Sequence, residues 1–336
     1  MNMSDSRPST IYDVARLAGV SHQTVSRLVK GASNVNPELR ARIEKALSEL
    51  DYHPNQAART LTTRKSRVIG AIVHDISEIG PSLIIQGASE RAREAGYFLE
   101  IVTVASQDPV GTESSIDLLK GREFAGIIAV SPSDEVAAPI NPGRLLLPVH
   151  IAHAADDDDE QSINQLGMTM LIDHLAGLGH ERFFLISGPR ETLSARNRAA
   201  AYAATLEHRG LISTGIGVGD WSARSGYGVI ADLGSIDFTA MVAANDQMAL
   251  GAIASLNDKG LAVPSDVSVV GFDDIAEAEF FRPPLTTIAQ NTKQQGRIAV
   301  DTLLRQIDPT VSLPPLARVR PELKVRESTA SPRADL

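Results

Sequence analysis

The sequence predicts a mixed α/β protein in which a small all-α module precedes a larger body of two lobes, each a parallel sheet covered by helices. Three observations predict this fold class. The chain has 336 residues, more than a single small domain needs. Its N-terminal segment up to Leu50 shows only short helical patterns. From Val68 onward, two separate series of short apolar runs alternate with helical segments, which is typical of parallel strands buried on both faces.

The N-terminal segment contains the start and stop signals of two short helices. Thr10 is a good N-cap residue, Asp13 follows in the first turn, and Gly19 can adopt the left-handed conformation that ends a helix. Ser21 can then cap a second helix with the sequence HQTVSRLV. The apolar Val25 of this helix would pack against the first.

The opposite face of the second helix carries side chains that can read DNA bases. His22 and Ser26, and likewise Gln23 and Arg27, are four residues apart and form two adjacent stripes. Gln can pair bidentately with adenine and Arg with guanine. Two short helices joined by a tight turn therefore fit a helix-turn-helix that enters the major groove. Any single piece of this pattern is equally compatible with an ordinary amphipathic helix pair.

A third helix is expected from Pro37 to about Leu50. Asn36 as N-cap and proline at the first helical position favour a start there. The apolar positions that would close a three-helix core are Leu39, Ile43, Ala46, Leu47 and Leu50.

Charge is distributed unevenly along the chain. Up to Arg67 there are eleven Lys/Arg and six Asp/Glu, a balance of +5, which leaves −14 for the remainder of the total of −9. This asymmetry indicates that only the N-terminal head approaches phosphate groups, while the acidic body is repelled by them.

Composition excludes several classes of chemistry. The chain has no cysteine, so a disulfide framework, a thiolate metal site and a cysteine nucleophile are all excluded. The first ten residues are polar, and no apolar run approaches the roughly 18 residues that span a bilayer. We expect a cytoplasmic, nucleoid-associated protein with no membrane contact, no cofactor and no metal. The acidic run at 156–160 is interpreted as a solvated loop.

The head also resembles a known family. The string TIYDVARLAGVSHQTVSRLVKGASNV, followed by LDYHPNQAARTL, is similar to the N-terminal domain of the lactose-repressor (LacI/GalR) family of bacterial transcription regulators. The resemblance implies contacts with double-stranded operator DNA from Thr10, Ser21, His22, Gln23, Thr24, Ser26, Arg27, Asn34, Asn55, Ala58 and Leu61.

The resemblance further makes residues 55–61 a hinge helix, followed by a polar linker. In the family this helix folds on operator binding and inserts a leucine into the minor groove, a position that Leu61 occupies. Such a short helix is marginal alone in water, so coupling its formation to DNA is physically sensible. The leucine would kink the central base step.

In the body, the first series of apolar runs is VIGAIV, FLEIVTV and GIIAV, and the second is FFLIS, AMVAAN and VSVVGF. Helices are expected at 82–95, near 114–119, from about 165 to 178, at 194–209 and at 247–259. Ligands of such sheets lie beyond the carboxyl ends of the strands. The polar residues expected at those ends are His74, Asp75, Asn245, Asp246, Asp273 and Asp274. Asp and Asn after a strand are also common turn and cap residues.

The body segments SARNRAAAY, GDWSARSGY, ANDQMALG, SVVGFDD and PPLTTIAQ resemble the effector domain of the same family, including its type member. The resemblance implies a two-lobed, periplasmic-binding-protein-like clamp for a mono- or disaccharide or a glycoside. The residues that it places around the ligand are Arg198, Trp221, Asn245, Asp273 and Gln290. His74, at the end of the first strand, completes the expected ligand-binding set. Trp221, the only tryptophan, would stack on a sugar face; a core role is its alternative.

Two positions depart from the type member. His153 stands where it has an acidic group, and Thr292 where it has an aromatic one. A galactoside is therefore a doubtful ligand.

The predicted organisation is a DNA-binding domain at 1–54, a hinge and linker at 55–66, and an effector domain of two lobes. The first lobe comprises 67–163 and 292–318, the second 164–291 and 319–329, and a tail covers 330–336. This tail lacks leucine heptads, so we expect a homodimer.

These features predict a repressor that binds a pseudo-palindromic operator and is released by a sugar. One rival is a two-lobed sugar-binding protein without DNA function, which the basic head opposes. Another is an enzyme, with GIGVG at 215–219 as a phosphate loop. That signal is weak because it lacks the G-x-G-x-x-G spacing and a P-loop lysine.

Overall fold

The computed structural model describes residues 9–29, 36–52, 66–104, 119, 122–130, 145, 147–152, 162–311 and 313–333. The chain divides into two compact units, Met1–Ser66 and Arg67–Leu336, which are called here the head and the body.

The head is a three-helix module, composed of α1 (Ile11–Ala18), α2 (His22–Val29) and α3 (Pro37–Glu49). Thr10 and Asp13 form a reciprocal capping box at the start of α1, and Gly19 ends it with φ of 65°. Val14, Val25 and Ile43, one from each helix, are fully buried against one another. The sequence predicted all three helices and their caps because the signals are local.

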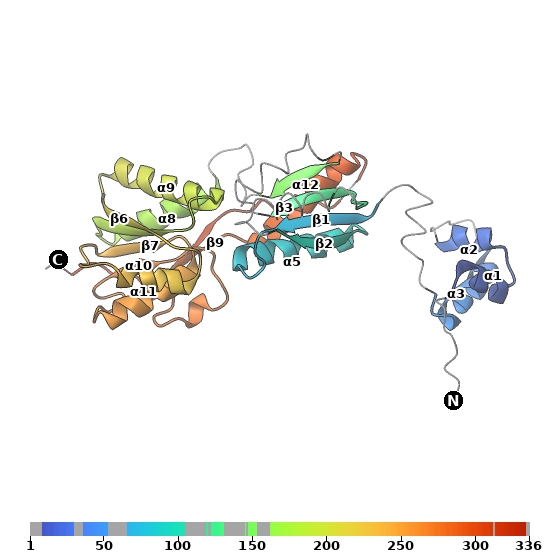
Figure 1. Cartoon of the computed structure of the whole chain (residues 1–336), viewed down its shortest axis with the longest axis horizontal. Helices are drawn as coiled ribbons and strands as arrows, with labels where there is room; N and C mark the ends of the chain where they lie inside the picture. Colours follow the sequence, from blue (N-terminus) through green and yellow to red (C-terminus); the bar gives the residue numbers. More distant parts are fainter. Residues whose placement is uncertain are drawn as a thin grey trace, which may run out of the picture. The chain divides into compact units, whose positions relative to one another are not determined.

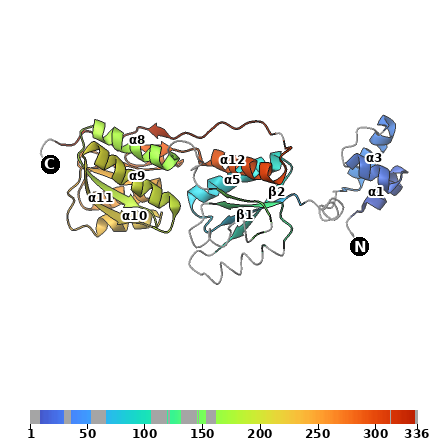
Figure 2. The same cartoon turned by 90° about the horizontal axis from the view of Figure 1, so that it is seen from above.

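The first lobe of the body contains a parallel sheet of order β2-β1-β3-β4. Its strands are β1 (Val68–Val73), β2 (Phe98–Thr103), β3 (Gly126–Val130) and β4 (Val149–Ala152). Helices α5 (Ile79–Glu94) and α12 (Thr292–Ile307) lie side by side over this sheet, although they are far apart in sequence (Figure 1 and Figure 2). Ile128 and Val130 of β3 pack beneath them.

The second lobe repeats the arrangement with the sheet order β6-β5-β7-β8. Its strands are β5 (Arg182–Ser187), β6 (Ile212–Val218), β7 (Ala240–Ala243) and β8 (Ser268–Val270). Helices α8 (Ile163–Gly177) and α9 (Leu193–Arg209) cover one face, and α10 (Ala223–Ala231) and α11 (Asp246–Asp258) cover the other (Figure 1). Successive residues of β5 alternate between these faces: Phe183 joins the α8–α9 core and Phe184 the α10–α11 core.

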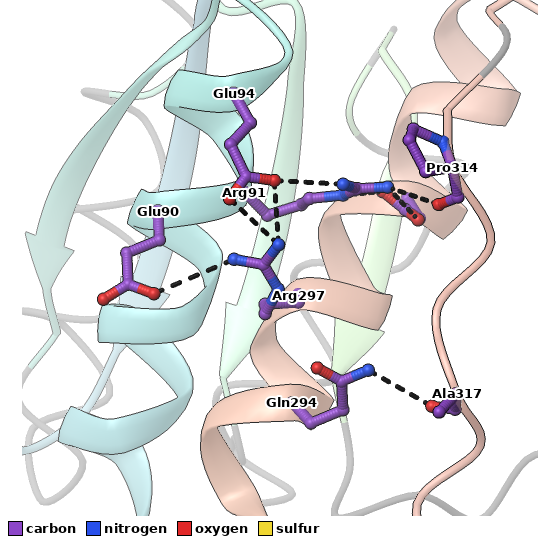
Figure 3. Close-up of polar contacts among 8 residues, drawn as sticks. Glu90, Arg91, Glu94, Gln294, Arg297, Pro314 and Ala317 are labelled. Atoms are coloured by element: carbon purple, nitrogen blue, oxygen red, sulfur yellow. Dashed lines mark hydrogen bonds and ion pairs between the residues drawn. The ribbon is translucent and has the colours of Figure 1, made fainter.

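The chain crosses between the lobes more than once. After β9 (Thr287–Ala289), α12 returns to the first lobe, and the chain then runs to β10 (Glu322–Lys324), which pairs antiparallel with β9. Two side chains hold the returning segment: Arg91 Nη2 donates to the Pro314 carbonyl at 2.9 Å and Gln294 Nε2 to the Ala317 carbonyl at 3.2 Å (Figure 3).

The structure differs from the sequence-based expectation in a few places. Helices α5, α9 and α11 begin at Ile79, Leu193 and Asp246, slightly before their predicted first residues 82, 194 and 247. GIGVG at 215–219 contributes to the edge strand β6 rather than to a loop between a strand and its helix. The helix expected near 114–119, the hinge helix and the acidic run lie outside the described residues, except Leu119.

Among the described residues, no helix has both the length and the apolar character needed to cross a bilayer.

Candidate functional site

Helix α2 presents a polar face on the surface of the head. Ser21, His22, Gln23 and Arg27 are exposed, whereas Val25 on the other face is fully buried. The geometry follows from helical periodicity, since one apolar position per turn points to the core and the intervening positions point outward. The predicted stripe residues therefore remain available to a partner.

Several predicted DNA-contacting residues also have structural roles in the head. The Ser21 Oγ accepts from the Thr24 backbone N–H at 3.2 Å and lies 2.9 Å from Thr24 Oγ1, so Ser21 caps α2. Thr10 Oγ1 donates to Asp13 Oδ2 at 2.6 Å. Ser26 is half-buried. Asn34, Asn55, Ala58 and Leu61 lie outside the described residues.

Tyr12 is an exposed aromatic side chain that the sequence analysis did not single out. It is 61% exposed, and its ring centroid lies 5.0 Å from that of His22. A position on α1 that should face solvent thus carries a large ring beside the start of α2. The signal was available in the sequence, because Tyr12 falls between the apolar positions of α1.

The body contains a cavity of about 620 Å³, counting the part open to solvent. The structure brings all six predicted ligand residues to its wall: His74, Arg198, Trp221, Asn245, Asp273 and Gln290. His74, Asn245 and Asp273 follow β1, β7 and β8, as expected for the carboxyl ends of parallel strands. Gln290 follows β9, Arg198 lies on α9, and Trp221 lies in the loop between β6 and α10.

Arg198 is the buried cation of the cavity wall. It is 4% exposed, its Nε donates to Asn164 Oδ1 at 2.8 Å, and its Nη1 donates to the Ala244 carbonyl. Its Nη2 lies 3.5 Å from Asp273 Oδ1, and its guanidinium lies over the Phe272 ring at 3.8 Å. This guanidinium is thus held in one orientation before any ligand arrives, which lowers the entropic cost of binding.

Asp273 faces Arg198 from a strained backbone. Its φ is 120°, in a region that L-residues rarely adopt, and Gln290 Nε2 donates to its Oδ1 at 2.6 Å. Burial raises the pKa of Asp273 to about 6, while Arg198 acts in the opposite direction. Strained non-glycine residues concentrate at functional sites, where surrounding contacts hold them.

Trp221 also has a positive φ, 71°, and is partly buried at the edge of the α10–α11 core. Its ring lies directly against Gly188, where an added Cβ would come within 2.3 Å of the indole. The Arg198 guanidinium is 5.8 Å from the ring centroid. The indole therefore combines partial core packing with a place in the cavity wall.

Asn245 has most of its hydrogen-bonding capacity engaged within the protein. Its Oδ1 caps α11 by accepting from the Met248 N–H at 2.8 Å, and its Nδ2 donates to the Trp221 carbonyl at 2.9 Å. The side chain thus links the start of α11 to the loop of Trp221. It has one further N–H to offer a ligand.

Asp246 is a buried carboxylate behind this wall that the sequence analysis named only as a strand-end residue. It is fully buried and accepts from Thr287 Oγ1 at 2.5 Å and from the Ile275 N–H at 2.9 Å. Burial, together with the nearby Asp273 carboxylate, raises the pKa of Asp246 to about 7. Asp246 therefore connects three segments that surround Asp273.

The first lobe contributes a pair of side chains, His74 and Glu78, of which the sequence analysis named only His74. His74 Nε2 lies 3.2 Å from Glu78 Oε1, and both residues line the cavity. This hydrogen bond raises the pKa of His74 against the opposing effect of burial. Glu78, Gln295 and Thr292 line the cavity as well, and Glu78 and Gln295 were not predicted. His153 lies outside the described residues.

Comparison with known proteins matches both units. Residues 10–55 match the model of the lacI family of bacterial regulatory proteins, and residues 172–329 match the periplasmic binding protein-like domain.

Relatives match over nearly the whole length. The lactose operon repressor of Escherichia coli K12 is 34% identical over 340 residues, covering 98% of this chain and 94% of the relative. The ribose operon repressor of the same organism is 31% identical over 308 residues, covering 89% and 93%. A crystal structure of the lac repressor dimer bound to operator and the anti-inducer ONPF superimposes with a TM-score of 0.85 at 32% identity, covering 96% of this chain and all of that one.

Proposed function

Because the chain belongs to the lacI family of bacterial regulatory proteins, we propose that it is a transcription repressor whose affinity for operator DNA changes when it binds a small sugar or glycoside. The observation that carries this proposal is the combination, in one chain, of an exposed polar helix face in a basic head and a polar cavity in an acidic body.

For the head, the proposal assigns base contacts to α2. Gln23 and Arg27 are exposed on this helix and offer the bidentate donors and acceptors that distinguish bases in the major groove. His22 and Tyr12 would flank them. The hinge segment with Leu61 is proposed to insert at the centre of the operator.

For the body, the proposal assigns the ligand to the cavity. Arg198 and Asp273 would bind neighbouring hydroxyl groups, and Trp221 would cover the C–H face of a pyranose ring. Because residues from both lobes line the cavity, a ligand that prefers one lobe arrangement would shift the equilibrium between arrangements. By linkage, operator DNA must then weaken ligand binding by the same factor.

The active form is proposed to be a homodimer in the cytoplasm. Exposed apolar side chains on α10, α11 and the short helix at Ala278–Phe280 support this, namely Tyr227, Leu250 and Phe280. The structure that superimposes on this chain is that of a lac repressor dimer, which supports the same assembly. A two-fold dimer would present two α2 helices about one turn of DNA apart.

The test is selection of DNA by the purified full chain from a random duplex pool, followed by gel shifts at two salt concentrations with and without sugars. We expect pseudo-palindromic duplexes, affinity that falls steeply with salt, and release by one sugar class. Equal affinity for random and selected duplexes would refute the repressor. Sugar binding without any DNA binding would instead identify a two-lobed sugar-binding protein.

A further inference from the structure

The cavity wall contains three buried polar atoms that have no hydrogen-bond partner among the described residues. They are His74 Nδ1, Gln290 Oε1 and Gln295 Oε1. All three residues line the cavity. Buried polar atoms are nearly always paired, so three unpaired ones on one cavity wall indicate a place for the polar groups of a ligand.

The two glutamines are held so that each presents an acceptor. Gln290 Nε2 donates to Asp273 Oδ1 at 2.6 Å, and Gln295 Nε2 donates to the Gln290 carbonyl at 3.0 Å. Because these donors fix the orientation of both amides, each Oε1 is left as the free end. The residues are 3% and 6% exposed, so bulk water does not satisfy them freely.

Glu78, which pairs with His74, adds a further oxygen to this acceptor set. Glu78 Oε1 is engaged by His74 Nε2, which leaves the second oxygen of Glu78 and His74 Nδ1 for other partners. Glu78 precedes α5 in the first lobe, whereas Asp273 follows β8 in the second. Burial is the main cause of the raised pKa of Asp273, and the Glu78 carboxylate of the other lobe adds to it.

This arrangement favours ligands whose groups donate hydrogen bonds. Glu78, Asp273, Gln290 and Gln295 all present acceptor oxygens, which require O–H or N–H donors. A further carboxylate would be repelled by Glu78 and Asp273, and the cation Arg198 is already paired with Asp273.

We propose that Glu78, Gln290 and Gln295, with His74 holding Glu78 in place, form an acceptor-rich subsite that selects a neutral ligand with adjacent hydroxyl groups and rejects the corresponding acid. Glu78 and Gln295 are specificity-determining residues of this subsite. The inference rests on the proposed function, because it specifies the ligand of the same cavity.

The experiment measures calorimetric binding of the full chain to glucose, galactose, lactose and cellobiose, and to glucuronate and galacturonate. We expect at least one neutral sugar to bind and its acid counterpart to bind at least tenfold more weakly. An acid that binds as tightly as its neutral counterpart overturns the subsite. If no probe binds while operator DNA does, the sugar class is wrong, and the subsite falls with it.

Variants test the residues themselves. Gln295→Met, which keeps the volume and removes the acceptor, should weaken neutral-sugar binding about tenfold. Glu78→Gln, which keeps the size and removes the charge, should reduce the discrimination against the acid. Glu207→Gln on the exposed face of α9 is the matched control and should behave as the parent chain does.

Melting curves will show that each variant is folded. If both subsite variants are folded and bind every probe as the control does, the subsite is refuted while the proposed function stands.

Discussion

Arg91 of α5 and Asp301 of α12 form a bidentate ion pair, with Arg91 Nε 2.6 Å from Asp301 Oδ1 and Nη2 2.9 Å from Oδ2. Both side chains are buried (4% and 3% exposed), and the same guanidinium reaches Glu94 and the Pro314 carbonyl (Figure 3). The pair thus joins α5 to α12 and to the returning segment, whose contacting residues lie 210 and 223 positions after Arg91 in the sequence.

Arg91→Ala is expected to lower the free energy of unfolding of the body by about 3–5 kcal/mol, because it leaves the Asp301 carboxylate buried without a partner. Urea unfolding followed by Trp221 fluorescence measures this. The control is Arg182→Ala, which removes an exposed pair with Asp237 and should cost less than about 1 kcal/mol. Equal losses in the two variants would contradict the role of burial.

Arg27→Ala is expected to weaken binding to the selected operator by about 1–3 kcal/mol and to relax the preference at one base pair, if Arg27 contacts a guanine. Lys45→Ala on α3 carries the same loss of charge at an exposed position and should leave that preference intact. Gel shifts with single-base operator variants distinguish the two. An unchanged base preference in the Arg27 variant would remove it from the base-contacting set.

Gly188→Ala is expected to displace the Trp221 indole, because the new methyl group would lie 2.3 Å from the ring. The change should shift the Trp221 emission maximum and cost about 1–3 kcal/mol of stability through overpacking. Gly228→Ala in α10, where an added Cβ meets nothing within 4 Å, should be neutral or stabilising. Identical emission spectra for the parent and the Gly188 variant would contradict the displacement of the ring.

Stability should depend on the protonation of Asp246. Its pKa is raised from 3.8 to about 7, so the folded chain holds a proton that the unfolded chain releases at lower pH. This contribution to stability is complete below the lower value and is lost as pH rises through about 7. In the Asp246→Asn variant, the melting temperature should therefore fall less than in the parent chain as pH rises through about 7.

The exposed Asp232→Asn is the control for this series and should retain the parent's pH dependence. Some dependence should persist even in the Asp246 variant, because burial also raises the pKa of Asp273, to about 6. If the melting temperature of the parent chain does not fall as pH rises from 3.8 to about 7, Asp246 stays ionised in the folded chain.

The sequence was sufficient to predict those elements whose signals are local. Thr10, Asp13 and Gly19 mark the ends of α1 through contacts within a few residues. The run VIGAIV coincides with β1, because a strand buried on both faces carries such a continuous apolar run. Strand β6 was missed because Gly215 and Gly217 lower its β propensity, and its apolar residues are exposed at a sheet edge.

The residue types around the cavity were also visible in the sequence: family resemblance identified five residues, and the end of the first strand a sixth, His74, that the structure brings to its wall. What only the tertiary structure decided is which other groups meet them. Glu78 and Gln295 belong to helix ends that carry no motif, and they reach the cavity because α12 returns to lie against α5. Asp246 acquires its raised pKa from the exclusion of water by segments distant in sequence. Burial and long-range pairing depend on how the chain packs, and no local pattern records them.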